Sequence, residues 1–427
     1  MTTLDRPHVR AVDRAELRRQ VSRLFSPPPA TPLVGVEVEA LALDARTRRP
    51  VPPTLASGTG AAMAPTLASW AKGRGWTAVR SAAGTPAYAG PDGRVVSFEP
   101  GGQLEYASAP VASIARMEID LRDVLPSLAV ALANEGIELV ARGVDPATPL
   151  SDARLWVAED RYRRMATHYA RRGPWGRRMM RQTAALHINI DAPGPPFESW
   201  TVANAAAPAL LAAFANSPVV EGAESGHRSV RAAQWRHLDP TRTGIVPGGC
   251  DSVDQYLAFA LGADAFLLGS EDEVARPFET HLGQATNDDW HRHLTTLFPE
   301  VRPRRYLEVR SVDALPLQLL ALPVALLVGL LFDDQVRARA HEVLPPPDPD
   351  LLERAGRIGL ADAEVADVVR SVFDLGIQGL KSLSAEVVGP DIVARIERFR
   401  SSFTDQALDP GHRRGDRLVG DDDSISA

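Results

Sequence analysis

Four short segments of the chain alternate apolar residues with polar or ionised ones. They lie at residues 34–39, 103–106, 186–191 and 306–310. An alternation with a period of two predicts a strand that has one face on a core and a second face of different character. The second face of these four strands carries Glu37, Glu39, Gln103, Glu105, His187, Asn189, Glu308 and Arg310.

Carboxylates grouped on one sheet face repel one another unless a cation lies between them. A hard divalent metal with oxygen ligands is the natural occupant of such a group. For any single segment, a solvated outer strand face is the simpler explanation. Solvated faces usually mix Lys, Thr, Ser and Glu, however, and Lys is almost missing from these four segments. We therefore favour a sheet face that binds metal.

The remaining pattern predicts mostly helices. An amphipathic helix at 15–25 ends before Pro27, Pro28 and Pro29. A strand at 33–43, a loop at 44–65, a helix at 65–73 and a strand at 76–80 follow. A long helix at 112–134 has Gly136 as its C-cap. Further helical patterns cover 159–172, 201–216, 251–268, 317–340 and 350–403.

The segment from Glu99 to Glu105 contains a sharp Pro-Gly-Gly turn between its two carboxylates. Because this turn breaks the strand alternation, spacing alone leaves open whether Glu99 and Glu105 share a face.

The four polar strands lie far apart along the chain, so the whole chain is expected to contribute to one site. This arrangement predicts a single α+β domain with an antiparallel sheet and helices on its back, rather than a parallel βαβ array. We expect an N-terminal helix and Pro-rich lead at 1–30, one catalytic domain at 31–405 and a disordered acidic tail at 406–427.

Composition and charge exclude several classes of protein. The chain has 427 residues, of which 44% are hydrophobic and 24% charged, which is typical of a globular protein. A net charge of −7 argues against a general nucleic-acid binder. Arginine clusters at 161–181 and 302–305 favour a small anion or surface carboxylates as partners. The single cysteine, Cys250, excludes an intrachain disulfide and a cysteine-based zinc site.

The most apolar segment, residues 315–332, contains Pro316, Gln318 and Pro323. It reaches only the lower limit of about 17 residues for a membrane span. We therefore predict a buried core helix. The N-terminus has charges and no apolar stretch of the secretory type, so we expect a cytoplasmic protein.

Oxygen ligands without thiolates suit Mg²⁺, with Mn²⁺ as a second possibility. Mg²⁺ in enzymes commonly completes its shell with phosphate oxygens, which implies a nucleoside triphosphate. The sequence contains no GxxxxGK[ST] motif and no GxGxxG after a strand, so a P-loop or Rossmann cofactor is unsupported. A nucleotide held by metals over an open antiparallel sheet needs neither loop.

Four arginines near these segments are candidates for binding a carboxylate or a transferring phosphoryl group: Arg231, Arg236, Arg242 and Arg310. Each arginine taken alone is also explained by a surface ion pair. For Arg310 that explanation is weaker, because it shares the parity of Glu308 on an otherwise apolar strand. Metals, phosphate and carboxylate-binding arginines together indicate activation of a carboxylate by ATP.

The motifs Glu99-Pro-Gly-Gly-Gln-Leu-Glu105, Asp239-Pro-Thr-Arg-Thr-Gly244 and the block from His293 to Arg310 resemble the plant-type and bacterial glutamate–cysteine ligases. The similarity extends from about residue 33 to about residue 335. The Arg-, Ala- and Pro-rich composition is similar to actinobacterial members, which supply γ-glutamylcysteine to ergothioneine synthesis.

The resemblance implies the fold of the glutamine synthetase and guanido kinase group, a curved antiparallel sheet that forms a funnel with helices on its outer side. It implies ligation of L-glutamate to L-cysteine with ATP, giving γ-glutamylcysteine, ADP and phosphate. It further implies that Arg310 and Glu308 are catalytic, and that Arg231, Arg242, the weaker candidate Arg236, Gln103 and Asn189 contact substrate. Structural hydrogen bonds are an equal alternative for Gln103 and Asn189. The implied metal ligands are Glu37, Glu39, Glu99, Glu105, His187 and Glu308.

Two rivals stay open. The first is an ATP-dependent carboxylate–amine ligase on the same scaffold with a different amine acceptor. The second is a non-catalytic nucleotide- or amino-acid-binding relative, which predicts the loss of a metal carboxylate or of Arg310. Every such position is filled in this sequence.

Overall fold

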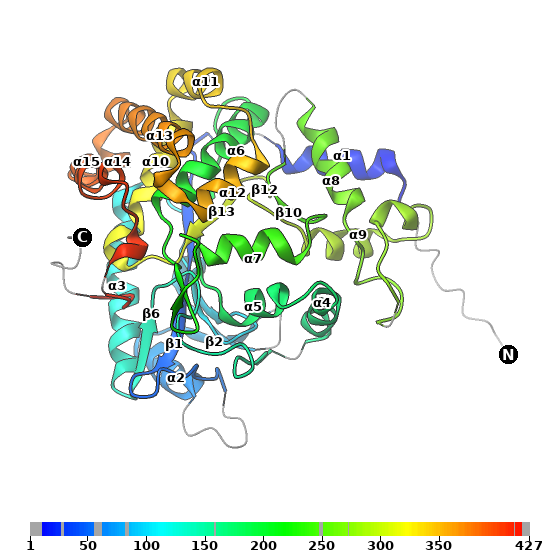
Figure 1. The fold of residues 1–427 in the computed structure, drawn as a ribbon, viewed down its shortest axis with the longest axis horizontal. Coiled ribbons are helices and arrows are strands. Elements are labelled where there is room, and N and C mark those ends of the chain that lie inside the picture. Colours follow the sequence, from blue (N-terminus) through cyan, green and yellow to red (C-terminus); the bar gives the residue numbers. More distant parts are fainter. Residues whose placement is uncertain are drawn as a thin grey trace.

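The computed structural model describes residues 11–26, 30–54, 62–81, 85–157, 159–246, 251–271, 273–413 and 415–420. The expected stop at Pro27, Pro28 and Pro29, Cys250 and the last residues of the tail, 421–427, lie outside the described residues. Within them, nine strands form one sheet, and helices surround it (Figure 1).

All pairings in the large sheet are antiparallel. In spatial order the strands are β12 (Val301–Pro303), β13 (Leu307–Asp313), β7 (Ala185–Ile190), β1 (Val34–Asp44), β5 (Leu104–Ala107), β4 (Val95–Phe98), β3 (Pro86–Ala89) and β2 (Thr77–Arg80). β6 (Ile137–Val140) pairs with the second half of β1. The predicted α+β class with an antiparallel sheet is confirmed.

The register brings the polar residues of the four segments together. Glu37 lies opposite His187, and Glu39 lies opposite Glu105. Glu308 lies opposite Asn189 on the next strand pair. Because side chains alternate along each strand, these polar residues share one face of the sheet.

The other face of the sheet carries the core. Val34, Val36 and Val38 of β1 are at most 2% exposed. Helices α2 (Met63–Gly73), α3 (Ile114–Ala133), α6 (Pro196–Ala213) and α10 (Ala321–Phe332) cover this face. A further layer on them comprises α12 (Pro349–Arg357), α13 (Ala363–Ser382), α14 (Ala385–Val388) and α15 (Ile392–Ser402) (Figure 1).

The apolar segment at 315–332 forms a core helix, as predicted, and nearly all of α10 is buried. Among the described helices, no single one has the length and hydropathy of a membrane span; residues 317–343 satisfy that test only as two helices bent by 97°. The expected continuous helix at 317–340 is wrong. The chain breaks at Asp333, whose side chain accepts a hydrogen bond from the Val336 N–H and caps α11 (Asp334–Val343).

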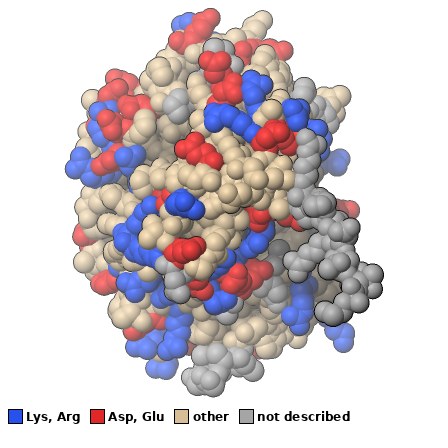
Figure 2. Space-filling model, turned by 90° about the vertical axis from the view of Figure 1, so that its right-hand side faces the viewer, with Lys and Arg blue, Asp and Glu red and all other residues tan. Residues whose placement is uncertain are grey.

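Shorter elements lie over the polar face and beside it: α4 (Asp160–Ala170), α5 (Trp175–Gln182), α7 (Val230–Leu238), β8 (Val219–Val220), β9 (Ala223–Glu224), β10 (Thr243–Gly244) and β11 (Phe298–Pro299). The side of the molecule shown in Figure 2 carries α1 (Arg14–Leu24), α8 (Ser252–Gly262) and α9 (Asn287–Leu294). Lys and Arg are interspersed with Asp and Glu on this side (Figure 2). Helices α5, α7 and α9 were not predicted, because each has only eight or nine residues and so shows little of a helical period.

The tail expected to be disordered from residue 406 differs in its described part. The backbone of Leu418 donates to the Leu139 carbonyl at 2.9 Å, and Ala141 donates to the Asp416 carbonyl at 2.7 Å. Leu418 is only 1% exposed. A single buried apolar residue and the edge of β6 thus hold residues 415–420, although their composition is that of a disordered segment.

Candidate active site

A cavity of about 270 Å³ lies over the polar face of the sheet. Helices α4, α5 and α7 and the start of β12 contribute its other walls. Eight predicted site residues line it: Glu37, Glu39, Glu99, Gln103, Glu105, His187, Arg231 and Arg310. The tertiary structure thus gathers residues from segments that lie far apart in the chain.

One wall of the cavity is acidic. Carboxylate oxygens of Glu39, Glu99 and Glu105 lie within 4.8 Å of one another. Burial, together with the charge of Glu105, raises the pKa of Glu39 to about 8. Burial and the charge of Glu39 raise the pKa of Glu99 to about 7, and the pKa of Glu105 is raised well above its ordinary value. Glu99 thus shares the site with Glu105. The turn between them is closed by a hydrogen bond from Glu99 N to the Gln103 carbonyl at 2.9 Å.

His187 connects this wall to a fourth carboxylate, that of Glu37. Its Nδ1 lies 3.2 Å from Glu37 Oε2 and 3.8 Å from Glu39 Oε1. Burial and the positive charge of Arg310 lower the pKa of His187 to about 4. The imidazole is therefore neutral near pH 7, which is the form that ligates metals.

These residues fit a divalent cation. Three buried carboxyl groups crowd together, and burial with their mutual repulsion raises their pKa values. A cation between them removes both the repulsion and the cost of burial. Glu39, Glu99 and Glu105 form the tightest candidate set, with Glu37 and His187 beside them. Oxygen donors in this number suit Mg²⁺ or Mn²⁺.

The amides Asn189 and Gln103 have structural contacts. Asn189 donates to Glu37 Oε1 at 3.0 Å, and Gln103 donates to the Thr183 carbonyl at 2.7 Å. Gln103 Oε1 is buried and has no hydrogen-bond partner within the described residues. Asn189 Oδ1 is likewise buried without a partner there; Gln103 lines the cavity, and the amide nitrogen of Asn189 orients Glu37.

The opposite wall is basic and is organised around Glu308, which is fully buried. Its carboxylate accepts hydrogen bonds from Arg302 at 2.5 Å, Arg310 at 2.6 Å and Arg304 at 2.9 Å. Burial alone would raise the pKa of Glu308, but these guanidinium groups hold it well below its ordinary value. Glu308 was expected to ligate metal. In the structure its oxygens accept hydrogen bonds from three guanidinium groups and hold the arginines in place, and the metal contact expected of Glu308 stays a prediction.

Sequence reasoning missed Arg302 and Arg304 as site residues. The signal was present: Arg302 lies on β12 directly opposite Glu308, and Arg304, two residues later, follows the end of that strand. Their grouping was noted only as a basic cluster. It takes the hairpin register to show that they face the same carboxylate.

Arg310 is also held by aromatic rings. Its guanidinium carbon lies 5.2 Å from the Trp235 ring centre and 5.4 Å from that of Phe298. Arg231, beside it, donates to the Arg310 carbonyl at 2.7 Å and lies 3.7 Å from Asp313. Both arginines line the cavity from fixed positions.

The structure does not bring Arg236 and Arg242 to this cavity. Arg236 bonds to Glu353 and to the Pro349 carbonyl, each at 2.7 Å, which ties α7 to α12. Arg242 is fully buried and donates to Asp239 at 2.7 Å and to Thr296 Oγ1 at 2.9 Å. Both predictions of substrate contact are therefore corrected: the guanidinium groups serve tertiary contacts.

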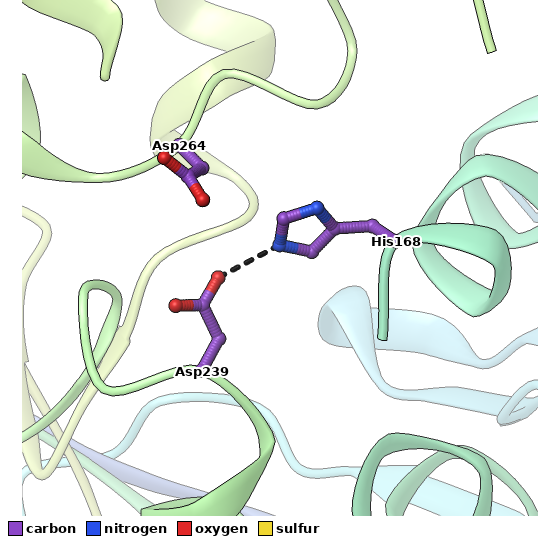
Figure 3. Close-up of side chains that lie close together, drawn as sticks. All are labelled: His168, Asp239 and Asp264. Atoms are coloured by element: carbon purple, nitrogen blue, oxygen red, sulfur yellow. Dashed lines mark hydrogen bonds and ion pairs between the residues drawn. The ribbon is translucent and has the colours of Figure 1, made fainter. Parts of the chain in front are cut away.

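Arg242 belongs to a second group of ionisable residues, of which Figure 3 shows His168, Asp239 and Asp264. His168 Nε2 lies 2.8 Å from Asp239 Oδ2, and Asp264 lies close to both. Arg172 bonds to Asp239 at 2.8 Å and to Asp264 at 2.9 Å. Together with Arg242, it neutralises the two carboxylates, so this group does not need a cation. Its ion pairs join α4 to the loops after α7 and α8.

A third part of the cavity is apolar. Met165 of α4 and Met179 and Met180 of α5 line it, together with Tyr162. The three methionines are at most 7% exposed. Thioether side chains provide a soft surface that adapts to a small apolar or sulfur-containing group. This surface was not located from the sequence.

The model of glutamate–cysteine ligase family 2 (GCS2) matches residues 33–376. The chain belongs to this family. The predicted family is thereby confirmed, and so is the prediction that the chain is a ligase.

Named relatives agree with this placement. The chain is 33% identical over 356 residues to glutamate–cysteine ligase EgtA of Mycobacterium tuberculosis, covering 77% of this chain and 78% of the relative. It is 35% identical over 296 residues to EgtA of Mycolicibacterium smegmatis, covering 64% and 68%. A chloroplastic glutamate–cysteine ligase of rice is 29% identical and covers 69% and 64%.

A solved structure shows the same fold. Glutamate–cysteine ligase of Francisella tularensis, in complex with AMP, matches with a TM-score of 0.53 over 89% of this chain and 83% of that one. At 13% sequence identity this likeness concerns the fold, and it confirms the fold expected from the resemblance.

Proposed function

We propose that this family member joins the γ-carboxylate of L-glutamate to the amine of L-cysteine through a γ-glutamyl phosphate, giving γ-glutamylcysteine, ADP and phosphate. One observation carries the proposal: a single cavity places three crowded carboxyl groups opposite a wall of arginines. The acidic wall suits a metal-bound triphosphate, and the basic wall suits the carboxylate that is to be phosphorylated.

The acidic wall would hold Mg²⁺ through Glu39, Glu99 and Glu105, with Glu37 and His187 beside them. When bound, the metal supplies positive charge that offsets the negative charge of the triphosphate. The neutral form of His187 and the raised pKa values of the carboxyl groups make this wall ready to exchange protons for a cation.

The basic wall would act during phosphoryl transfer. A γ-carboxylate oxygen of glutamate attacks the γ-phosphorus of ATP, and ADP leaves. Arg310 and Arg304 face the cavity, where they can bind the transferred phosphoryl oxygens. Glu308 and the rings of Trp235 and Phe298 fix Arg310 before substrate arrives, so little reorganisation is needed. Arg231 is placed to bind the second carboxylate of glutamate.

The acceptor would lie against Met165, Met179 and Met180. The cysteine side chain, a methylene that carries a thiol, is small and weakly polar, which suits a thioether surface. The cysteine amine then attacks the acyl carbon, phosphate leaves with the bond electrons, and the amine gives up a proton. The apolar wall also excludes water, which would otherwise hydrolyse the acyl phosphate.

The test is phosphate release by the purified protein with ATP, Mg²⁺ and glutamate, with the amine acceptor varied. We expect turnover with cysteine and much slower turnover with alanine, serine or glycine. Robust turnover with another amine and none with cysteine would assign the alternative ligase activity. We further propose that the product feeds ergothioneine synthesis in the cytoplasm, which the similarity to EgtA supports. Deleting the gene should then lower the cellular ergothioneine content.

A further inference from the structure

Asp313 lies at the end of β13, after an irregularity in that strand. Glu308 lies opposite Asn189 on β7, Asp313 lies opposite Ala185, and the register shifts between residues 309 and 312. Residues directly opposite on antiparallel strands point to the same side of a sheet, so Asp313 shares the polar face with Glu308. The two residues are an odd number of positions apart, and a regular strand would have placed Asp313 on the core face. Such bulges re-aim a side chain and are common beside active sites.

The carboxylate of Asp313 is fully buried and is fixed by neutral groups. Ser217 Oγ donates to it at 2.7 Å, and Ser229 Oγ donates at 2.9 Å. The backbone N–H of Asn216 donates at 2.8 Å. Behind the carboxylate, a Cβ on Gly143 would lie 2.4 Å from its carbon, so the carboxylate has no room to move in that direction.

The cation that faces this carboxylate is Arg231, which lines the catalytic cavity and is only 3% exposed. Its Nη1 lies 3.7 Å from Asp313 Oδ1, which is beyond hydrogen-bond distance, and its Nη2 donates to the Arg310 carbonyl at 2.7 Å. Burial raises the pKa of Asp313, while the charge of Arg231 and the three hydrogen bonds act against that rise. Asp313 therefore offsets the charge of Arg231 without competing for its donors with a carboxylate in the cavity.

Asp313 is also tied to the backbone of Arg231. Ser229 is the N-cap of α7, where its Oγ accepts a hydrogen bond from the Ala232 N–H at 3.1 Å. Ser217 Oγ accepts one from the Arg231 N–H at 3.3 Å. Both hydroxyls donate to Asp313 at the same time, so one carboxylate fixes the first turn of α7 and the guanidinium that this turn carries.

We propose that Asp313 is a positioning residue for the glutamate site, which holds Arg231 where a carboxylate of glutamate binds. The inference rests on the proposed function, in which Arg231 binds that carboxylate. Asp313 itself lies behind the cavity wall, since Arg231 and Arg310 line the cavity and Asp313 does not. It acts through Arg231 and touches no substrate.

The test is the steady-state kinetics of Asp313→Asn, measured as phosphate release with varied glutamate and saturating ATP, Mg²⁺ and amine acceptor. We expect the KM for glutamate to rise about tenfold or more, because a charged contact that orients the binding group is lost. The kcat should stay within about threefold, since this contact acts equally on the ground state and the transition state. The KM for ATP should be unchanged. A wild-type KM for glutamate, or a loss confined to kcat, would overturn the proposal.

Glu118→Gln is the matched control, because it also removes the counter-charge of a largely buried arginine. Glu118 accepts a hydrogen bond from Arg395 at 2.6 Å, and this pair joins α3 to α15, which do not line the cavity. The substitution should lower the melting temperature and leave the KM for glutamate unchanged. An equal rise of that KM in both variants would show that lost stability explains the effect, and would refute the role of Asp313.

A double-mutant cycle with Arg231→Gln tests whether Asp313 acts through Arg231. Arg231→Gln should raise the KM for glutamate at least as much as Asp313→Asn does, and adding Asp313→Asn to it should change that KM by less than about twofold. Effects that multiply would contradict the proposal. If Asp313→Asn does not fold, Ser217→Ala decides: it removes one of the three hydrogen bonds and should raise the KM for glutamate about threefold, and an unchanged KM would count against Asp313.

The proposed function is judged separately from the role of Asp313. Phosphate release by the wild type that does not depend on glutamate, whichever amine is supplied, would refute the proposed function. Hydrogen exchange then tests Asp313 without turnover. Asp313→Asn should raise the exchange rates of the Arg231 and Ala232 amides, which the two serines hold, and Glu118→Gln should leave them unchanged. Equal rates in Asp313→Asn and the wild type would exclude Asp313 as the anchor of Arg231.

Discussion

Arg310 donates a hydrogen bond to Glu308 at 2.6 Å, and both side chains are buried: Arg310 is 9% exposed and Glu308 is fully buried. A buried ion pair of this kind is favourable only when its geometry is well satisfied. Arg302, Arg304 and the two aromatic rings provide that geometry. The pair is thus a prearranged part of the site.

Arg310→Lys should reduce kcat about 100-fold, which is the usual cost of losing a donor that stabilises charge in the transition state. Lysine cannot both stack between the rings and bond to Glu308. Arg304→Lys is the control. Arg304 bonds to the same carboxylate but is 47% exposed, so its ammonium can adapt, and we expect less than about a tenfold change. Steady-state phosphate release measures both. Equal losses of kcat in the two variants would contradict the prediction that the fixed position of Arg310 matters for the reaction.

Glu308→Gln should lower the free energy of unfolding by about 3 kcal/mol, because the buried guanidinium groups lose their shared counter-charge. Urea denaturation gives this value. Asp254→Asn is the comparison: it breaks the exposed ion pair between Arg18 and Asp254, and it should produce no measurable change. A stable Glu308→Gln protein would mean that the arginines are neutralised by another group.

The acidic wall predicts a link between pH and metal. The folded-state pKa of Glu39 is raised to about 8 and that of Glu99 to about 7, both from 4.5. Between the unfolded-state pKa of 4.5 and these raised pKa values, the folded protein holds protons that the unfolded chain has released. The metal-free protein should therefore lose stability as pH rises from about 5 to about 8. Mg²⁺ replaces those protons, and its stabilising effect should grow over the same range.

Melting temperatures with and without Mg²⁺ at about pH 6 and about pH 8 measure this link. Glu105→Gln, which resembles the protonated side chain, is the matched variant. Its metal-free form should lose less stability at the higher pH, and it should gain less from Mg²⁺. A magnesium effect that is the same at both pH values, or the same in wild type and variant, would exclude this wall as the metal site.

His293 predicts a loss of stability on the acid side. Burial lowers its pKa from 6.5 to about 3, and its Nε2 lies 2.8 Å from the Ala260 carbonyl. The unfolded chain takes up a proton below about pH 6.5 while the folded chain does not, so stability falls as pH decreases. One unit below the unfolded-state pKa the loss is about 1.4 kcal/mol. His293→Gln should flatten this part of the curve, measured by urea denaturation, and an unchanged slope would contradict the assignment.

Helices α10 and α13 meet at glycines. A Cβ on Gly329 would lie 2.0 Å from the Gly376 carbonyl oxygen, and one on Gly379 would lie 1.9 Å from that of Gly329. Gly329→Ala should therefore lower the free energy of unfolding by about 2 kcal/mol or more. Gly262→Ala, in α8, meets nothing within 4 Å and should leave stability unchanged or slightly raised. Similar effects of the two substitutions would mean that the helices can separate at no cost.

Several outcomes could be predicted because they depend on local pattern. The alternation at 34–39, 186–191 and 306–310 fixes which side chains share a face, and the structure has strands there. The apolar run before Asp333 had to be buried. Five of the predicted residues, Glu37, Glu39, Glu105, His187 and Arg310, lie on strands and line the cavity for this reason: strand parity is a property of the chain itself.

Other outcomes depend on partners that no local pattern contains. Arg236 and Arg242 look like substrate ligands in the sequence, yet Glu353 and Thr296 bind them. Residues 415–420 have the composition of a disordered tail, yet they pair with β6. In each case the deciding contact is made by a residue that is distant in the sequence and comes close only when the chain has folded.

By itself the sequence determined the family, the α+β class and the set of carboxylates, because motifs and strand parity are written in consecutive residues. Only the tertiary structure decided that Glu99 joins Glu39 and Glu105, that Glu308 holds three arginines, and that methionines complete the cavity. The reason is physical: the charge on a side chain is set by all the groups around it, and those groups come together only when the sheet and helices have packed.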